Sequence, residues 1–180
     1  MLDKASLRKI LVLLVLLSVS ALQLVAQTPD PIESIRQHYA SINKNVALYR
    51  RVKKYLSGFS AEGGDLVAYF HGPTIMKIVA TFLGETGKSV EEYYYWDGQF
   101  IFIFRRESRY DKPLSGKVVS TTENRFYFKD DKLIRWIDEN GKQIALDKDE
   151  YKEKQNEYLK SSKQFSDGAR SAKPTIEDTP

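Results

Sequence analysis

Residues 93–104 constrain the fold of this chain more than any other stretch, because two aromatic and aliphatic runs flank the pair Asp97–Gly98. Asp and Gly tolerate the positive φ angles of a type I′ turn, so this pattern predicts a β-hairpin with a two-residue turn, in which Tyr95 lies opposite Phe100. Since side chains alternate between the two faces of a strand, we expect two apolar faces: Tyr93, Tyr95, Phe100, Phe102 and Phe104 on one, and Tyr94, Trp96, Ile101 and Ile103 on the other. Such a hairpin belongs at the centre of a sheet that is covered on both sides.

The first 26 residues have the layout of a secretory signal peptide. Lys4, Arg8 and Lys9 precede an apolar run over residues 10–22, and Ala26 offers a small residue for cleavage. The run is shorter than the roughly 20 apolar residues that a membrane-spanning helix needs, although an uncleaved membrane anchor is the alternative. We therefore predict that residues 1–26 are a signal peptide. The protein is expected to be periplasmic or secreted, with no membrane association after cleavage.

Composition excludes several classes of function. The chain of 180 residues contains no cysteine, which excludes disulfide bonds, thiol catalysis and cysteine-ligated metals. Removal of the signal peptide takes away three basic residues and one acidic residue, so the formal net charge of +4 falls towards zero. A small basic cluster among the aromatic strands could contact single-stranded nucleic acid, but the low charge and the export signal favour no nucleic-acid partner; the cluster is Arg105, Arg106 and Arg109.

Helix signals stand at both ends of the remaining chain. Asp30 can cap a helix whose first turn contains Pro31 and Glu33. Ile and Tyr residues follow at helical spacing over residues 32–42. A second helix is expected from Asp147 to about residue 165, where Tyr and Phe recur every seven residues. Residues 166–180 are polar and contain one glycine and two prolines, so we expect a disordered tail there.

Between the two helices, β-prone runs alternate with turn signals. Residues 48–56 are expected to form an edge strand, because Lys and Arg residues interrupt this run and charge discourages pairing with other chains. From residue 65 to residue 138 the alternation is that of an antiparallel meander. The sequence therefore predicts an α+β fold in a single domain over residues 27–165. A β-meander of six to seven strands forms a curled sheet or half-barrel, with an N-terminal and a C-terminal helix.

The meander also predicts where function lies. Consecutive strands run in opposite directions, so the loops over residues 57–64, 84–88 and 107–120 should share one end of the sheet. Because function is usually placed on loops held by a rigid sheet, the polar residues of this end form the candidate binding site: Glu62, Glu85, Arg109, Tyr110 and Asp111. The alternative is that Glu62 and Glu85 pair with Arg109 or Lys88, or simply face water.

No motif in the sequence specifies a reaction. Glu91 and Glu92 are adjacent on a strand and point to opposite faces, so they cannot act together on one bond. His38 and His71 lack the spacing of a metal site, and no Gly-x-Ser-x-Gly elbow is present. We expect no catalytic residue, no metal ion and no cofactor.

Four short segments in the middle half of the chain carry a resemblance: Glu62-Gly63-Gly64, Gly84-Glu85-Thr86-Gly87, Tyr93-Tyr94-Tyr95 and Glu123-Asn124-Arg125-Phe126-Tyr127-Phe128. In this combination the sequence resembles a group of small secreted bacterial proteins that have no assigned function. The resemblance implies an antiparallel sheet outside the cytoplasm and implies no activity.

Together these features favour an exported, non-catalytic module that binds an unknown protein or small ligand. It would use either the loop end of the sheet or an exposed aromatic face of the hairpin. Two alternatives stay open. The first is a small secreted hydrolase that uses Glu62 and Glu85, and the second is an inhibitor of a secreted enzyme.

Overall fold

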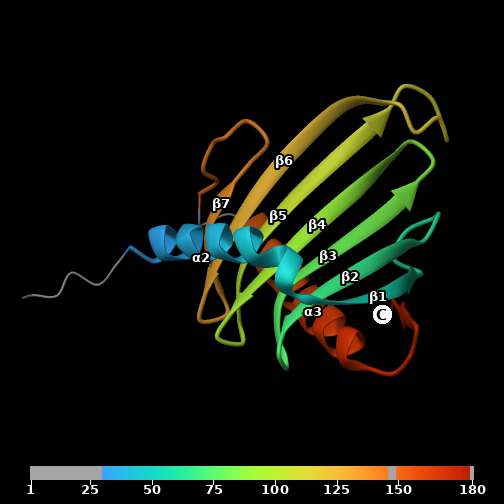
Figure 1. Cartoon of the computed structure of the whole chain (residues 1–180). Coiled ribbons are helices and arrows are strands. Elements are labelled where there is room, and N and C mark those ends of the chain that lie inside the picture. The colour runs from blue at the N-terminus through green and yellow to red at the C-terminus, as the bar shows by residue number, and fades with distance from the viewer. Residues whose placement is uncertain (1–29, 146–148, 179–180) are drawn as a thin grey trace, which may run out of the picture. The chain divides into compact units, whose positions relative to one another are not determined.

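The structure is a computed structural model that describes residues 30–145 and 149–178. From Pro31 onward these residues form one compact unit, in which an eight-stranded sheet carries one helix on each face (Figure 1). Helix α2 (Pro31–Asn45) continues into the 3-10 helix η2 (Val46–Leu48), and helix α3 (Asp149–Arg170) follows the meander. The predicted signal peptide over residues 1–26 and the expected helix start at Asp147 lie outside the described residues.

Seven consecutive strands form an antiparallel meander, and a short eighth strand lies beside the first: β1 (Arg50–Ser57), β2 (Gly64–His71), β3 (Thr74–Gly84), β4 (Gly87–Trp96), β5 (Gln99–Tyr110), β6 (Val118–Lys129), β7 (Lys132–Ile137) and β8 (Thr175–Glu177). Their order in the sheet is β7-β6-β5-β4-β3-β2-β1-β8, and only β8 runs parallel to its neighbour. The predicted α+β fold, with a mostly antiparallel sheet and a helix at each end, is confirmed. The sheet is open and has more strands than the six to seven expected.

The central hairpin forms at the predicted turn, but it contains a bulge that was not expected. Both turn residues have positive φ angles, 49° and 78°, as a type I′ turn requires. Tyr95 pairs with Phe100, whereas Tyr94 pairs with Phe102, so Ile101 is an extra residue on β5. A slip of one residue moves each following side chain to the other face. The predicted face assignment is therefore wrong beyond the bulge: Phe102 and Phe104 pack on the α2 side, and Ile103 packs on the α3 side.

Each face of the sheet buries its own apolar core. Tyr158 and Phe165 of α3 pack on one face, and Ile35 and Ile42 of α2 pack on the other. The three Tyr residues of β4 and the three Phe residues of β5 are each at most 9% exposed, while Trp96 is partly buried. The helices therefore cover the hairpin aromatics, and an exposed aromatic sheet face, one of the two expected binding surfaces, is contradicted.

The predicted disordered tail is wrong for residues 166–178. Helix α3 continues to Arg170, and β8 pairs with β1 through Tyr55–Ser57. Two interactions explain the order. Ile176 is 6% exposed and packs so close to Gly168 that a Cβ there would lie 2.5 Å from its Cδ1. The Nζ of Lys54 donates hydrogen bonds of 2.7 and 2.6 Å to the carbonyls of Ser171 and Lys173.

Strand β1 is consequently an edge strand only in part. Its start is at Arg50 rather than residue 48, because Val46–Leu48 form the 3-10 helix. Beside Tyr55–Ser57 the outer side of β1 is occupied by β8. Within the described residues, the rest of β1 has no strand on that side, so the predicted edge holds for its first five residues.

Candidate functional site

Backbone hydrogen bonds join the loops that were predicted to share one end of the sheet. The N–H of Glu62 donates to the carbonyl of Leu83 at 3.2 Å, which ties the β1–β2 loop to β3. The N–H of Leu114 donates to the carbonyl of Glu85 at 2.7 Å, which ties the β5–β6 loop to the β3–β4 turn. The meander thus brings all three connections together, as the alternation of strand direction requires.

A hollow of about 530 Å³ opens at this end of the sheet. Its floor and walls include Phe82 on β3, Ser89 on β4, Glu107 and Arg109 on β5, and Thr122 on β6. Side chains of Ser60 and Ala61 in the β1–β2 loop add another wall. We call this space the loop-end hollow. Ser89, Glu107 and Thr122 are each four positions from a residue of the α3-side core on the same strand, and residues an even number of positions apart share a face. The hollow therefore lies on the face that carries α3.

Aromatic packing holds the β1–β2 wall of the loop-end hollow in place. The ring of Phe59 lies 5.3 Å from that of Phe165 in α3 and 6.3 Å from that of Phe82 in β3, between centroids. The residue after Phe59 is Ser60, whose hydroxyl donates to the carbonyl of Gly63 at 2.6 Å. The β1–β2 wall is thus anchored to both the sheet and the helix, beside a hollow that is wide open to solvent.

Of the five predicted site residues, Arg109 alone lines the loop-end hollow. Glu62 and Glu85 are exposed and form no ion pair within the described residues. Tyr110 is half-buried, and its backbone N–H donates to the carbonyl of Thr86 at 2.8 Å. These residues share the loop end, but the structure does not gather them around one cavity.

Asp111 instead stabilises its own loop. The hydroxyl of Ser115 donates to its carboxylate at 2.6 Å, and the ammonium of Lys117 lies 3.2 Å from it. The Ser115 hydrogen bond, followed by the Lys117 interaction, lowers the pKa of Asp111. The carboxylate of Asp111 is thus occupied by partners within the β5–β6 loop.

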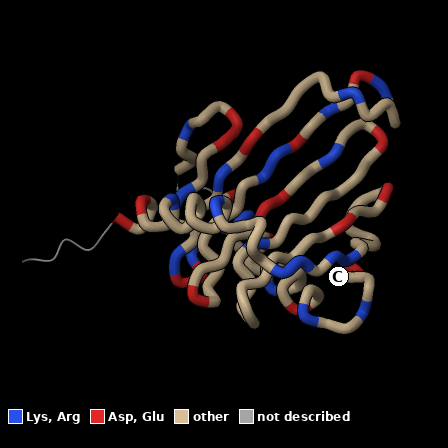
Figure 2. The backbone as a smooth tube through the Cα atoms, viewed as in Figure 1, with Lys and Arg blue, Asp and Glu red and all other residues tan. Residues whose placement is uncertain are grey.

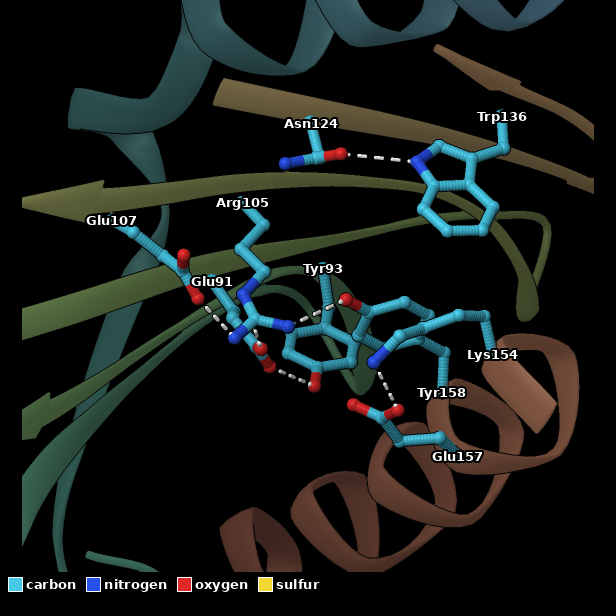
Figure 3. Close-up of polar contacts among 9 residues, drawn as sticks. All are labelled: Glu91, Tyr93, Arg105, Glu107, Asn124, Trp136, Lys154, Glu157 and Tyr158. Atoms are coloured by element: carbon cyan, nitrogen blue, oxygen red, sulfur yellow. Dashed lines mark hydrogen bonds and ion pairs between the residues drawn. The ribbon is translucent and has the colours of Figure 1, made fainter. Parts of the chain in front are cut away.

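A buried polar network, whose contacts are drawn in Figure 3, is linked to the wall of the loop-end hollow through the ion pair of Arg105 with Glu107. It consists of Glu91, Tyr93, Arg105 and Tyr158, and we call it the Glu91 network. The hydroxyl of Tyr93 donates to Glu91 at 2.5 Å, and Arg105 donates to the hydroxyl of Tyr158 at 3.3 Å. The Arg105 guanidinium also contacts Glu91, with Nε 3.6 Å from Oε1, and it forms an ion pair with Glu107 on the wall of the hollow.

Burial dominates the electrostatics of the Glu91 network. Glu91 is 7% exposed, and removal from water raises its pKa, although the Tyr93 hydrogen bond and the Arg105 charge act in the opposite direction. Burial also raises the pKa of Tyr93 and that of Tyr158. The network therefore holds an acid with a raised pKa beside the Arg105 cation and two phenols whose pKa values are also raised.

The bulge in the hairpin explains why the sequence did not reveal the Glu91 network. The predicted register puts Glu91 opposite Phe104, whereas the observed register puts Glu91 opposite Arg105. Opposite charges on facing positions would have indicated a cross-strand ion pair. The prediction that Glu91 and Glu92 point to opposite faces is confirmed, because Glu92 forms its ion pair on the α2 side, with Lys77 at 2.7 Å.

The Glu92 contacts attach the end of α2 to the sheet. Asn43 accepts hydrogen bonds from Lys77 at 3.0 Å and from the hydroxyl of Tyr94 at 3.2 Å, while Tyr94 also donates to Glu92. Burial raises the pKa of Tyr94. All of these polar groups have partners within the protein, so the cluster holds α2 against the sheet.

Basic residues are dispersed over the sheet, and Figure 2 shows Lys and Arg interspersed with Asp and Glu. Arg106 and Arg125 both form ion pairs with Glu123, and both lie over the ring of Phe104.

His38 stacks on Trp96 with ring centroids 4.0 Å apart. Within the described residues, no group of three or more His, Asp or Glu side chains is placed to hold a metal ion. Neither α2 nor α3, the α-helices of the described part, is sufficiently long and apolar to cross a bilayer.

No protein family model matches the chain, and neither a curated protein nor a solved structure is significantly similar to it. The function must therefore be argued from the site.

Proposed function

We propose that this protein is an exported, non-catalytic binding module whose loop-end hollow takes a small polar ligand. The observation that carries the proposal is the open hollow itself, which has a volume of about 530 Å³ and a wall held by aromatic packing. This volume lies in the range of small-molecule sites. Export rests on the basic and apolar pattern of residues 1–26 and on the resemblance to small secreted proteins.

The lining indicates the chemistry of the ligand. Thr122 shares the hollow with the charged residues Glu107 and Arg109 and with Phe82. A ligand with several hydroxyl or amide groups, such as a sugar or a short peptide, fits this lining.

The arrangement favours binding over catalysis. General acid–base chemistry needs two groups that reach one bond from the same cavity. Glu107 lines the loop-end hollow, but Arg105 neutralises it, and Glu91 is covered by its own network. Glu62 and Glu85, the pair of the hydrolase alternative, are not part of the lining. An inhibitor of a secreted enzyme would use the same loop end and differs from our proposal in its partner.

A thermal-shift screen tests the proposal with a panel of monosaccharides, disaccharides, amino acids and dipeptides. A ligand at 100 times its dissociation constant stabilises the folded state by about 2.7 kcal/mol. For a domain of this size that amount raises the unfolding temperature by about 5 to 10 °C. We expect at least one member of the panel to give such a shift.

Two substitutions at adjacent positions then locate the site. Thr122→Val removes a hydroxyl from the loop-end hollow and should reduce the shift. Thr121→Val is the matched control, because residue 121 points to the opposite face of β6. The proposal is wrong if no compound shifts the unfolding temperature, or if both variants respond as the unsubstituted protein does.

A further inference from the structure

The floor of the loop-end hollow consists of two rows of residues that cross β4, β5 and β6 on the α3 side of the sheet. The residues of a row lie directly opposite one another in the strand register, so they share one face. One row contains Ser89, Glu107 and Thr122, and the other, nearer the loops, contains Gly87, Arg109 and Ser120. Every residue of both rows lines the hollow.

The next row towards the core shows where the cover of α3 ends. Glu91 lies opposite Arg105 and is 7% exposed, and Arg105 donates a hydrogen bond of 3.3 Å to the hydroxyl of Tyr158 in α3. Two residues further along β5, Glu107 is exposed, and its carboxylate forms an ion pair with Arg105. The acidic group of the loop-end hollow is therefore neutralised by a cation of the covered row.

Arg109 is the charged residue of the two rows that has no partner. Within the described residues its guanidinium forms no ion pair. Its neighbours across the sheet are Gly87, which has no side chain, and Ser120, which is uncharged. An acidic group that enters the hollow can therefore reach this guanidinium without displacing an acid of the protein.

We propose that the ligand of the loop-end hollow carries a carboxylate, which the guanidinium of Arg109 binds. This inference rests on the proposed function and narrows the ligand to an acidic sugar or to a short peptide with a free C-terminal carboxylate. A guanidinium presents two parallel N–H donors that match the two oxygens of a carboxylate. Ser120, directly opposite Arg109, adds a hydroxyl group for a further polar atom of the ligand.

The charge of the hollow selects a carboxylate over a phosphate. Lys88 lies between Gly87 and Ser89 on β4, so its side chain points to the opposite face of the sheet. The two rows therefore offer one unpaired positive charge, that of Arg109. A carboxylate carries one negative charge at neutral pH, whereas a phosphate monoester carries about −1.5 to −2. A monocarboxylic acid matches the single cation.

Calorimetric titration with two matched pairs of compounds tests the inference on the full-length protein. Glucuronic acid is compared with glucose, and dialanine with its C-terminal amide, so each pair sets a carboxylate against a neutral group. The two pairs distinguish a sugar ligand from a peptide ligand. Because Arg109 is exposed, water and salt weaken its interaction with a carboxylate. We expect the acid of at least one pair to bind about fivefold more tightly than its neutral partner.

Two neutralising substitutions locate the interaction. Arg109→Gln removes the guanidinium from the hollow and should abolish the preference for the acid. Lys112→Gln is the matched control, because Lys112 is an exposed cation of the adjoining β5–β6 loop that does not line the hollow. This variant should keep the preference. Unfolding temperatures of both variants show that each is folded.

Three results would overturn the inference while leaving the proposed function intact. They are equal affinities within both pairs, a preference that survives Arg109→Gln, and a preference that Lys112→Gln reduces as strongly as Arg109→Gln does. If neither acid binds, the inference is wrong as well. The proposed function fails with it only if the neutral compounds and the rest of the panel also leave the unfolding temperature unchanged.

Discussion

Glu91 and Glu92 are neighbours in the chain, yet the sheet gives them different surroundings. Glu92 pairs with Lys77 at 2.7 Å on the α2 side. Glu91 accepts its shortest hydrogen bond from a phenol, and its nearest cation atom, Nε of Arg105, lies 3.6 Å away. Alternation along a strand is sufficient to predict that the two face apart. The difference in their partners depends on which residues of the neighbouring strands lie opposite them, and this register cannot be read from the sequence.

The raised pKa of Glu91 has a consequence for stability that can be measured. Because burial raises the pKa in the folded state, folding favours the protonated form. This contribution is fully present below the unfolded pKa of Glu, about 4.3, and is lost as the pH rises through the folded pKa. Glu91→Gln cannot titrate, so the stability of the unsubstituted protein relative to this variant should increase as the pH is lowered from 8 to 4.

Chemical denaturation of both proteins across this pH range is the appropriate measurement. Gln is of similar size and can still accept a hydrogen bond from Tyr93, so the variant is expected to fold. A difference in unfolding free energy that stays constant with pH would show that burial does not control the protonation of Glu91.

Among the elements, the β4–β5 pair depends on a glycine at the edge of the loop-end hollow. A Cβ at Gly87 would lie 2.2 Å from the carbonyl oxygen of Ser108 on the neighbouring strand, whereas a Cβ at Gly84 would meet nothing closer than 3.5 Å. These two glycines pair with each other across the β3–β4 turn. The backbones of β4 and β5 approach each other at this point more closely than an alanine would allow.

Gly87→Ala should therefore destabilise the protein, by about 2 kcal/mol, because strand backbone must shift to admit the methyl group. For a domain of this size the unfolding temperature would fall by about 4 to 8 °C. Gly84→Ala is the matched control, and it should be neutral or slightly stabilising, since alanine restricts the unfolded chain. If calorimetry gives the same unfolding temperature for both variants, the close approach of β4 and β5 does not exist in solution.

Local signals were sufficient to predict most of the elements. Turn pairs such as Asp97–Gly98 marked the strands of the meander, and Pro31 marked the first helix. The β5 bulge left no such signal, because any residue of an apolar run can be the extra one. The polar composition of the tail predicted disorder. Its order depends on the contact of Ile176 with Gly168, and these two residues meet only after α3 has packed on the sheet.

For the whole molecule, strand alternation correctly predicted which loops meet, and the cavity lies where they meet. It did not predict the lining, since Ser89, Glu107 and Thr122 belong to strands and not to loops. The sheet extends beyond the end of the apolar core on the α3 side, and its polar side chains there form the loop-end hollow. A site made from strand residues depends on register, and a single bulge changes that register for half of a hairpin.

The central claim is that the loop-end hollow binds a small polar ligand, and amide chemical shifts measured during a titration test it most directly. The probe is the compound of the sugar and peptide panel that gives the largest thermal shift. We predict that the perturbed amides cluster at Ser89, Arg109, Ser120 and Thr122. Perturbations that cluster instead on α2 and the face of the sheet beneath it would contradict the claim.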